Sequence, residues 1–365
     1  MSVFRNSFTY GLTILGLFAA KTAMSQTYYI TDLGVLPGFD SSFGYGISEA
    51  GDAAGYLAPE GSFDFHAFFW TEGGGMQDIG TLGGPSSVAQ GVNSSQVVVG
   101  YSDLASAAYE HAFRWTDVGG MDDLGTLGGN FSRAFAINDS GVIAGESQIA
   151  DNTFRAFKWT ESDGMINLGT LGGSYSYARG INAGGQITGT AAIASGDARA
   201  FRWTEGVGME NLGTLPGHIL SNGLGINDAG DVVGYSSQTG TTYLAFVYKD
   251  GVGMTELVGL YNYDNRARDI NNLGDAVGHS WLSPDGSTAQ AVIWRDGAVY
   301  NLNDLLEGGA GWHLIDAYAI NDSGEIVGYG KLNDETRAYK LTPVPEPSCI
   351  FMLSGALVVL LRRRK

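Results

Sequence analysis

The segment Arg155-Ala156-Phe157-Lys158-Trp159, followed by Met165-Ile166-Asn167-Leu168-Gly169, recurs along the chain and decides its fold. The alanine of this segment returns at positions 67, 112, 156, 200, 245, 291 and 338. This spacing of about 45 residues is the length of one four-stranded blade of a β-propeller. The repeat therefore predicts one domain built from seven related units.

Each unit contains four short segments with strand character. The first is a Met-x-x-Leu/Ile-Gly run, the second ends in Ile-Asn or Val-Asn, and the fourth is an Ala-aromatic-x-Trp strand. We expect the third to end at a glycine that recurs at positions 55, 100, 145, 189, 234, 278 and 328. With 56 glycines in 365 residues and 16% charged residues, the composition favours short strands and tight turns over a helical protein.

Polar turn residues separate the second and third segments, as in Asn138-Asp139-Ser140-Gly141 and Asn321-Asp322-Ser323-Gly324. Asn and Asp side chains bond back to the turn backbone, and Gly supplies a positive φ. We therefore interpret the recurring Asn as a turn residue. A ring of ligand groups is the alternative.

The fourth segment carries a pair of large aromatic residues, such as Phe113 and Trp115. Alternation along a strand places both on one face. Burial of each ring contributes about 2 to 3 kcal/mol. We predict that these pairs fill the space between neighbouring units as core, rather than forming an aromatic cage for a ligand.

The repeat begins and ends in complementary ways. Residues 28–34 form a Leu-Gly strand with no Trp strand before it, and residues 337–341 form a Trp-type strand with no Leu-Gly strand after it. Pairing of these two segments would complete the last sheet and remove the exposed edges of an open array. The predicted fold is thus an all-β, seven-bladed propeller over residues 26–343, closed by its N- and C-terminal strands.

Residues 1–25 have the three-part form of a secretory signal peptide. Arg5 precedes an apolar run from Phe8 to Ala20, and Ala23-Met24-Ser25 provides a small-x-small cleavage site. We predict export and cleavage after Ser25 by signal peptidase. An uncleaved anchor is the alternative.

Residues 344–365 form a second three-part segment. Val344-Pro345-Glu346-Pro347 precedes the apolar run from Ile350 to Leu361, and the chain ends in Arg362-Arg363-Arg364-Lys365. A helix of twelve residues rises about 18 Å, less than the roughly 30 Å of a hydrocarbon core. The basic residues are expected to hold this end in the cytoplasm and leave the repeat domain on the far side of the membrane.

This tail resembles the PEP-CTERM sorting signal of Gram-negative bacteria. The resemblance implies that an exosortase cuts near Pro345-Glu346-Pro347. The protein would then pass from a transient inner-membrane anchor to the cell surface or the medium, often in bacteria that make exopolysaccharide. His66-Ala67-Phe68 and His111-Ala112-Phe113 make the repeat similar to the HAF-repeat family of bacterial extracellular proteins. That resemblance implies a secreted repeat protein and transfers no catalytic residue.

The charge of the repeat domain restricts its partners. Residues 26–343 contain 14 Lys and Arg against 37 Asp and Glu, a net charge of about −23. Nucleic acid and anionic lipid surfaces need a basic patch, so both are disfavoured. The one cysteine, Cys349, excludes an intramolecular disulfide.

We predict no catalytic and no metal-ligating residues. The five histidines have no metal-ligand spacing, although the Asp-rich turns leave a calcium-stabilised adhesin as a further interpretation. One irregularity is the 50-residue step from Ile270 to Ile320, with the excess around residues 307–313. Near it lie aromatic residues that could stack on a sugar ring, with ordinary loop variation as the alternative: Trp281, Trp312, His313, Tyr261 and Tyr263.

Together these features predict a non-enzymatic structural or binding module in the extracellular or exopolysaccharide matrix. The alternative is a polysaccharide lyase or hydrolase. Such an enzyme needs carboxylates that break the repeat pattern, and the sequence alone indicates no convincing pair.

Overall fold

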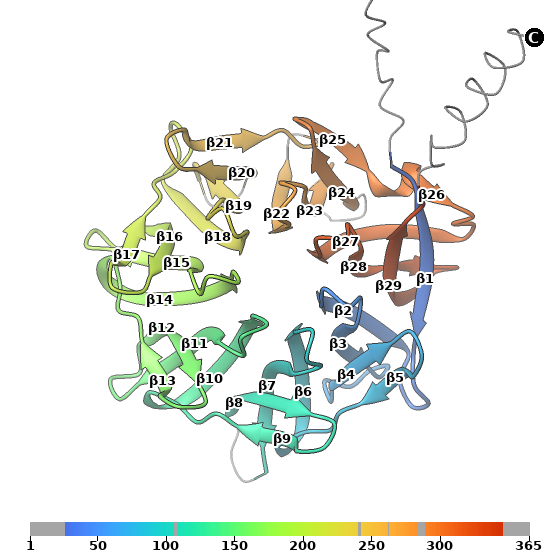
Figure 1. Ribbon diagram of the computed structural model, residues 1–365, viewed down its shortest axis with the longest axis horizontal. Coiled ribbons are helices and arrows are strands. Elements are labelled where there is room, and N and C mark those ends of the chain that lie inside the picture. Colours follow the sequence, from blue (N-terminus) through green and yellow to red (C-terminus); the bar gives the residue numbers. More distant parts are fainter. Residues whose placement is uncertain (1–25, 106–108, 240–241, 262, 283–288, 346–365) are drawn as a thin grey trace, which may run out of the picture.

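The computed structural model describes residues 26–105, 109–239, 242–261, 263–282 and 289–345. Within these residues the chain is all-β apart from one 3₁₀ helix, η1 (Leu302–Leu305). Four-stranded sheets follow one another around a central opening (Figure 1). The predicted repeat of short strands is therefore confirmed.

The first units along the chain are β2 (Ser41–Ile47), β3 (Ala53–Ala58), β4 (His66–Thr71) and β5 (Gly75–Asp78), then β6 (Gly83–Val92), β7 (Val98–Leu104), β8 (Glu110–Thr116) and β9 (Gly120–Asp123). The next are β10 (Gly128–Ile137), β11 (Ile143–Ile149), β12 (Phe154–Thr160) and β13 (Gly164–Asn167), then β14 (Gly172–Ile181), β15 (Ile187–Ile193), β16 (Ala198–Thr204) and β17 (Gly208–Asn211).

Two further units are β18 (Leu220–Ile226), β19 (Val232–Ser237), β20 (Tyr243–Lys249) and β21 (Gly253–Leu257), then β22 (Asp264–Ile270), β23 (Ala276–Trp281), β24 (Ala289–Arg295) and β25 (Ala298–Asn301). One parallel bridge, Tyr243 with Asp264, joins these two units. The remaining strands are β26 (Leu306–Glu307), β27 (Trp312–Ile320), β28 (Ile326–Leu332), β29 (Glu335–Pro343) and β1 (Tyr28–Gly34). The strands beside the central opening are β2, β6, β10, β14, β18, β22 and β27 (Figure 1).

The N-terminal strand pairs with the C-terminal one. β1 runs antiparallel to β29, from Tyr28 opposite Pro343 to Gly34 opposite Ala338. The Arg295 guanidinium also donates a hydrogen bond to the Tyr28 hydroxyl at 3.1 Å. The first and last segments of the repeat therefore share one sheet.

The extra residues between Ile270 and Ile320 extend this same sheet and pack against it. They form η1 and then β26, which pairs in parallel with β1 through Tyr28 and Leu306. Leu302 and Leu305 are buried in the core cluster that contains Tyr28. The insertion thus adds a strand and two core side chains where the two ends of the repeat meet.

The prediction for the recurring glycine was wrong. It lies inside the strand formed by the predicted third segment, not at its end, as Gly100 does within β7. That strand is the second from the central opening in each sheet. A Cβ on Gly100 would lie 2.0 Å from the Val88 carbonyl oxygen of β6, next to a β-bulge between Ala89 and Gly91. Glycine is required here because two backbones approach closely, a role in strands that differs from a turn.

The alanine of the repeat segment faces the next unit. The Ala112 N–H donates to the Ser132 hydroxyl oxygen at 2.8 Å, and this hydroxyl donates to the Gly125 carbonyl at 2.6 Å. The same alanine-to-serine bond recurs at positions 67, 156, 200 and 338. Small residues at this boundary keep neighbouring sheets in hydrogen-bonding contact.

The aromatic pairs pack as core between units, as predicted. Phe113 and Trp115 are buried in one cluster with Phe69 and Val92. The centres of the Phe69 and Trp115 rings lie 5.7 Å apart. Burial of these rings stabilises the boundary between adjacent sheets.

Some predicted segments lie outside the described residues: the signal peptide 1–25, Glu346, Pro347, the apolar run and the four C-terminal basic residues. Val344 is described, and its N–H donates to the Thr27 carbonyl at 2.9 Å. Pro345 follows it as the last described residue. In the described part of the chain, no helix has the length and apolarity needed to cross a membrane.

Candidate functional site

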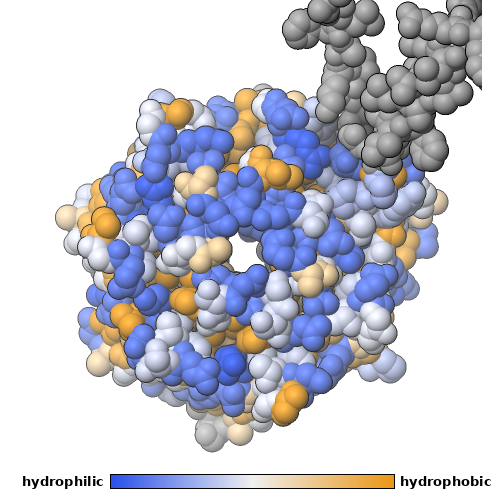
Figure 2. Space-filling view, in the orientation of Figure 1, coloured by the Kyte–Doolittle hydropathy of each residue, from blue (hydrophilic) through white to orange (hydrophobic). Residues whose placement is uncertain are grey.

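A cavity of about 420 Å3 occupies the centre of the ring. Its walls come from the innermost strands and from the turns that follow them. Figure 2 shows the opening on one face, with mainly hydrophilic residues around it. Every unit contributes residues to this cavity, so the cavity is a candidate site that the whole domain forms.

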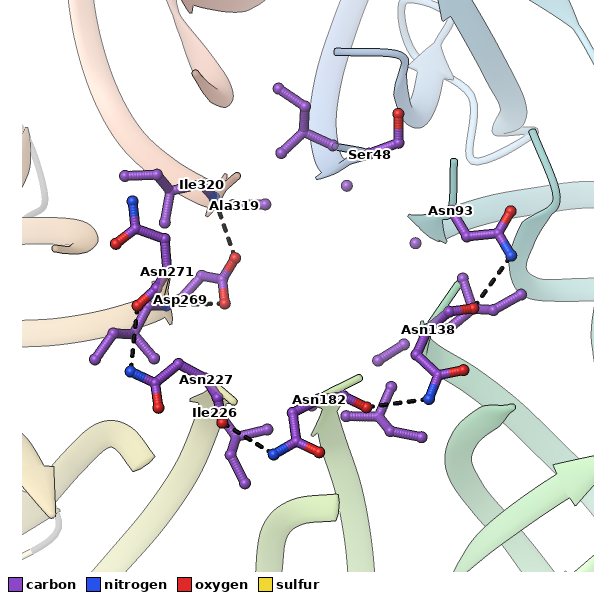
Figure 3. A pocket seen from close by; sticks show the side chains of 18 of the residues that line it. Ser48, Asn93, Asn138, Asn182, Ile226, Asn227, Asp269, Asn271, Ala319 and Ile320 are labelled. Atoms are coloured by element: carbon purple, nitrogen blue, oxygen red, sulfur yellow. Dashed lines mark hydrogen bonds between the residues drawn. The ribbon is translucent and has the colours of Figure 1, made fainter. Parts of the chain in front are cut away.

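Asparagine side chains link the units around one end of this cavity (Figure 3). In six units the side-chain NH₂ donates to the backbone carbonyl of the equivalent residue in the next unit, over 2.9 to 3.2 Å. We call these residues the asparagine girdle: Asn93, Asn138, Asn182, Asn227, Asn271 and Asn321. Each girdle residue is at most 7% exposed.

Each girdle asparagine also shapes its own turn. Its side-chain oxygen accepts the N–H of the residue four positions later, as Asn227 does from Asp231 at 3.0 Å. The predicted role in the turn is therefore confirmed. The bonds between units are a second role, which the pattern within one unit does not reveal because the partner is about 45 residues away.

The position after the girdle residue carries a further circle of polar groups. The Ala183 N–H donates to the Asp228 carboxylate at 2.9 Å, and the Asp322 N–H donates to the Glu49 carboxylate at 3.0 Å. Burial raises the pKa of Glu49, and the carboxylates of Asp322, Asp139 and Asp228 raise it further. These carboxylates give one mouth of the cavity a negative charge.

The cavity wall differs from unit to unit at one repeat position, two residues before the Ile or Val of the Ile-Asn motif. There the units carry Gln90, Phe135, Arg179, Leu224, Arg268 and Tyr318, all of which line the cavity, and Tyr45, whose ring lies 4.3 Å from that of Tyr318. The Arg179 guanidinium lies 3.7 Å from the centre of the Phe135 ring. A position whose side chain differs between units, while the surrounding positions repeat, is typical of a binding surface rather than of packing.

Asp269 breaks the repeat more sharply. The equivalent residues are glycine or alanine: Gly46, Gly91, Ala136, Gly180, Gly225 and Ala319. Its carboxylate accepts the N–H groups of Ile270 at 2.9 Å and Ile320 at 3.1 Å (Figure 3). Desolvation raises the pKa of Asp269 to about 6, against the lowering effect of these two bonds. A comparison of the repeat copies column by column would have identified this residue.

The raised pKa of Asp269 predicts a pH-dependent stability. Between about pH 4 and pH 6 the folded protein holds the proton more tightly than the unfolded chain, so the free energy of unfolding falls as pH rises through this window. We expect Asp269→Ala to reduce that fall by about 1 to 2 kcal/mol, after allowance for partial solvent screening. Denaturant titrations at pH 4 and pH 6.5 measure this. Asp122→Ala, on the exposed edge strand β9, is the control, and an unchanged pH dependence in Asp269→Ala contradicts the prediction.

A group of buried charges lies beside this wall. Asp316 accepts hydrogen bonds from Arg268 and from the His279 Nδ1 nitrogen, both at 2.9 Å. Burial alone would raise the pKa of Asp316, but Arg268 and His279 hold it below its ordinary value. Among the described residues the buried side-chain atoms without a hydrogen-bond partner are Arg268 Nε, His279 Nε2 and Asp316 Oδ1. Sequence analysis missed this group because its members come from different strands.

The predicted aromatic platform lies on the face opposite the asparagine girdle. Trp281 is the last residue of β23, and Trp312 is the first residue of β27. Both are half-buried: the Trp281 ring lies 5.4 Å from His279, and the Trp312 ring meets Tyr339 edge-on at 6.1 Å. Part of the surface of each ring is therefore used in packing, and part remains on this face.

The other platform residues are half-buried as well. His313 follows Trp312 in β27, opposite Lys331. Tyr261 and Tyr263 precede β22; the Tyr261 N–H donates to the Ser280 hydroxyl at 3.1 Å, and the Tyr263 carbonyl accepts the Tyr243 N–H at 3.3 Å. In the described part of the chain, no group of three or more His, Cys, Asp or Glu side chains is placed to hold a metal ion.

No protein-family model matches this chain. No curated protein sequence matches it either. Among solved structures it is similar to TolB from Acinetobacter baumannii, with 11% identity over 85% of this chain and 65% of that one, at a TM-score of 0.44. It is also similar to a gluconolactonase from Xanthomonas campestris, with 10% identity over 88% and 96% of the two chains and a TM-score of 0.42. A third similar structure is Trypanosoma rangeli sialidase, with 9% identity over 89% and 57% and a TM-score of 0.42.

Proposed function

We propose that this protein is an exported, surface-sorted binding module of the extracellular or exopolysaccharide matrix. Its domain is a closed seven-bladed β-propeller over residues 26–343. Residues 1–25 direct export, and residues 344–365 form a PEP-CTERM-type signal read by an exosortase. Its proposed partner is an extracellular polysaccharide, and the proposal assigns it no catalytic activity.

The placement of the two ends supports the sorting scheme. Gln26 would be the first residue after signal-peptide cleavage, and its side-chain NH₂ donates to the Val344 carbonyl at 2.7 Å. β29 ends at Pro343. A cut near Pro345 would therefore remove the tail without removing a strand from the sheet.

The observation that supports the binding function is that the repeated residues and the variable residues have different places in the domain. The repeated residues, namely the girdle asparagines, the serine and alanine between units and the buried glycine, hold the sheets together. The side chains that differ between units face the central cavity. Loops and variable positions on a rigid scaffold are where proteins place recognition.

The test is glycan-array binding by residues 26–343, which retain each described strand and nearly every core contact. We expect selective binding of polysaccharides that occur outside bacterial cells. No binding to any glycan overturns the proposed ligand class and leaves a protein partner or a structural role.

The predicted platform receives its own test in the same assay. We expect Trp281→Ala and Trp312→Ala to weaken glycan retention several-fold, because each substitution removes a ring from the face opposite the girdle. The conservative variants Trp281→Phe and Trp312→Phe serve as controls for loss of packing against His279 and Tyr339. Unchanged retention in the alanine variants removes these two residues from the binding surface.

The alternative, a polysaccharide lyase or hydrolase, is supported by Asp269. It is the one carboxylate among seven equivalent positions, and its pKa of about 6 suits a general acid or base. Incubation of the purified domain with bacterial polysaccharides, followed by size analysis, decides between the two. Depolymerisation that Asp269→Ala abolishes would establish the enzyme, and intact polymer favours the binding module.

A further inference from the structure

A second cavity, of about 340 Å3, lies on the face opposite the asparagine girdle. It is formed by the units that begin with β2, β6 and β10. Six of its residues matter here, and we call them the Phe63 pocket: Phe63, Phe65, Tyr101, Asp103, Glu110 and Arg133. Phe63 and Phe65 lie in the loop before β4, Tyr101 and Asp103 lie on β7, Glu110 begins β8, and Arg133 lies on β10.

Aromatic rings form one side of the pocket. Phe63 is 85% exposed, and its ring meets Phe65 edge-on with centres 6.2 Å apart. Phe65 in turn packs edge-on against Tyr56 at 5.3 Å. Phe65 is thus anchored, whereas the faces of Phe63 remain open to solvent at the pocket rim.

Two carboxylates form the other side. Asp103 and Glu110 are directly opposite each other on β7 and β8. Like charges in this arrangement destabilise a sheet. Burial raises the pKa of Asp103, and the neighbouring Glu110 raises it further. Repulsion between these two carboxylates therefore lowers the stability of the sheet.

The other units show that the fold does not require this pair. The residues equivalent to Asp103 in five of them are Gln148, Ala192, Ser237, Trp281 and Lys331, and none of their cross-strand partners carries a carboxylate. Arg133 also departs from the repeat, since the residues equivalent to it in neighbouring units are Val88 and Tyr177. Three residues that break the repeat thus meet in one cavity.

The positive charge of Arg133 does not give the pocket the ability to bind anions. Its guanidinium binds both Glu110 oxygens, at 2.7 and 2.8 Å, and reaches Glu146 at 3.4 Å. It also lies 5.2 Å from the centre of the Tyr101 ring. The positive charge is used within the protein, and the pocket retains an excess of negative charge that repels uronate or sulfate groups.

We infer that the Phe63 pocket binds one pyranose ring of a neutral polysaccharide. The apolar face of the sugar packs on the Phe63 ring, and its hydroxyl groups donate to the Asp103 and Glu110 carboxylates, as charge-assisted hydrogen bonds. Arg133 positions Glu110 for this contact. This inference rests on the proposed polysaccharide-binding function and adds a binding place outside the central cavity and the class of sugar.

The test is calorimetric titration of the full chain with cellotetraose, laminaritetraose and mannotetraose, and with tetragalacturonate as the acidic comparison. We expect at least one neutral probe to bind about tenfold or more tightly than tetragalacturonate. Phe63→Ala and Asp103→Asn should each weaken that binding about tenfold, equivalent to about 1.4 kcal/mol. Asp103→Asn removes a repulsion between like charges, so a loss of binding in this variant does not arise from unfolding.

Matched controls are Val207→Ala for an exposed apolar side chain and Asp122→Asn for an exposed carboxylate, both away from the pocket. Equal affinity of the wild type, Phe63→Ala and Asp103→Asn overturns the inference, as does preference for tetragalacturonate or failure of every neutral probe to bind. If the glycan array still shows binding in these cases, the proposed function stands and the pocket assignment fails. An empty array overturns both.

Discussion

Replacing Gly234 with alanine is expected to destabilise the domain by about 3 kcal/mol or more. The added Cβ would lie 1.9 Å from the Asn222 carbonyl oxygen of the neighbouring strand. Overpacking of a core usually costs about 1 to 3 kcal/mol. Here the obstacle is backbone, which cannot rotate away as a side chain can, so the cost lies at or above the upper end. Chemical denaturation of the purified variant measures it.

Gly73→Ala is the control for this prediction. Gly73 lies in an exposed turn where a Cβ meets no atom within 4 Å. We expect its denaturation midpoint to match that of the wild type. If Gly234→Ala unfolds at the same denaturant concentration as Gly73→Ala, close approach of the strands is not the reason for the recurring glycine.

The second large effect is expected at the asparagine girdle. Asn271→Ala removes the bond to the Asn321 carbonyl at 3.1 Å and leaves the N–H groups of Leu273 and Asp275 without their partner. Buried polar groups left unpaired cost about 1 to 3 kcal/mol each. We expect a loss of about 3 kcal/mol in the free energy of unfolding, measured by denaturant titration.

The chain supplies its own comparison for the girdle. The first unit carries Ser48, whose hydroxyl accepts the Asp52 N–H at 3.1 Å. The serine side chain is shorter than that of asparagine and does not reach the next unit at Asn93. We expect Asn271→Ser to lose less stability than Asn271→Ala, because serine can keep the bond within the turn. Ser48→Asn should add about 1 kcal/mol by completing the girdle. Equal stability of all these variants would show that the girdle contributes nothing measurable.

The local part of the structure could be predicted from the sequence because local signals determine it. The turn at Asn138 to Gly141 depends on a side chain and a φ angle within four residues. Burial of Phe113 and Trp115 follows from the two-residue period of a strand. Each signal recurs about every 45 residues, so the four recurring strands of a unit and their order could be predicted from the repetition.

The sequence analysis was wrong or incomplete where a contact with another strand determines the local structure. The sequence pattern predicts that Gly100 ends a strand, but the Val88 carbonyl of the adjacent strand is what excludes a side chain there. For the 50-residue step the sequence leaves a sugar-stacking surface and ordinary loop variation open; the step contains η1 and also β26, which joins the sheet of β1. In both cases the sequence shows the irregularity and omits the contact that explains it.

By itself, the sequence determined the all-β class, the repeat and its turns, since these depend on neighbours within a few residues. It also contains the terminal segments from which we predict export and sorting. The tertiary structure alone decided that Asn side chains bond from unit to unit, that Asp269 faces a shared cavity, and that Asp103 and Glu110 meet beside Phe63. These arrangements join residues from seven positions apart, as for Asp103 and Glu110, to 273 positions apart, as for Asn321 and Ser48. Their energies depend on distance in space, which the order of residues does not specify.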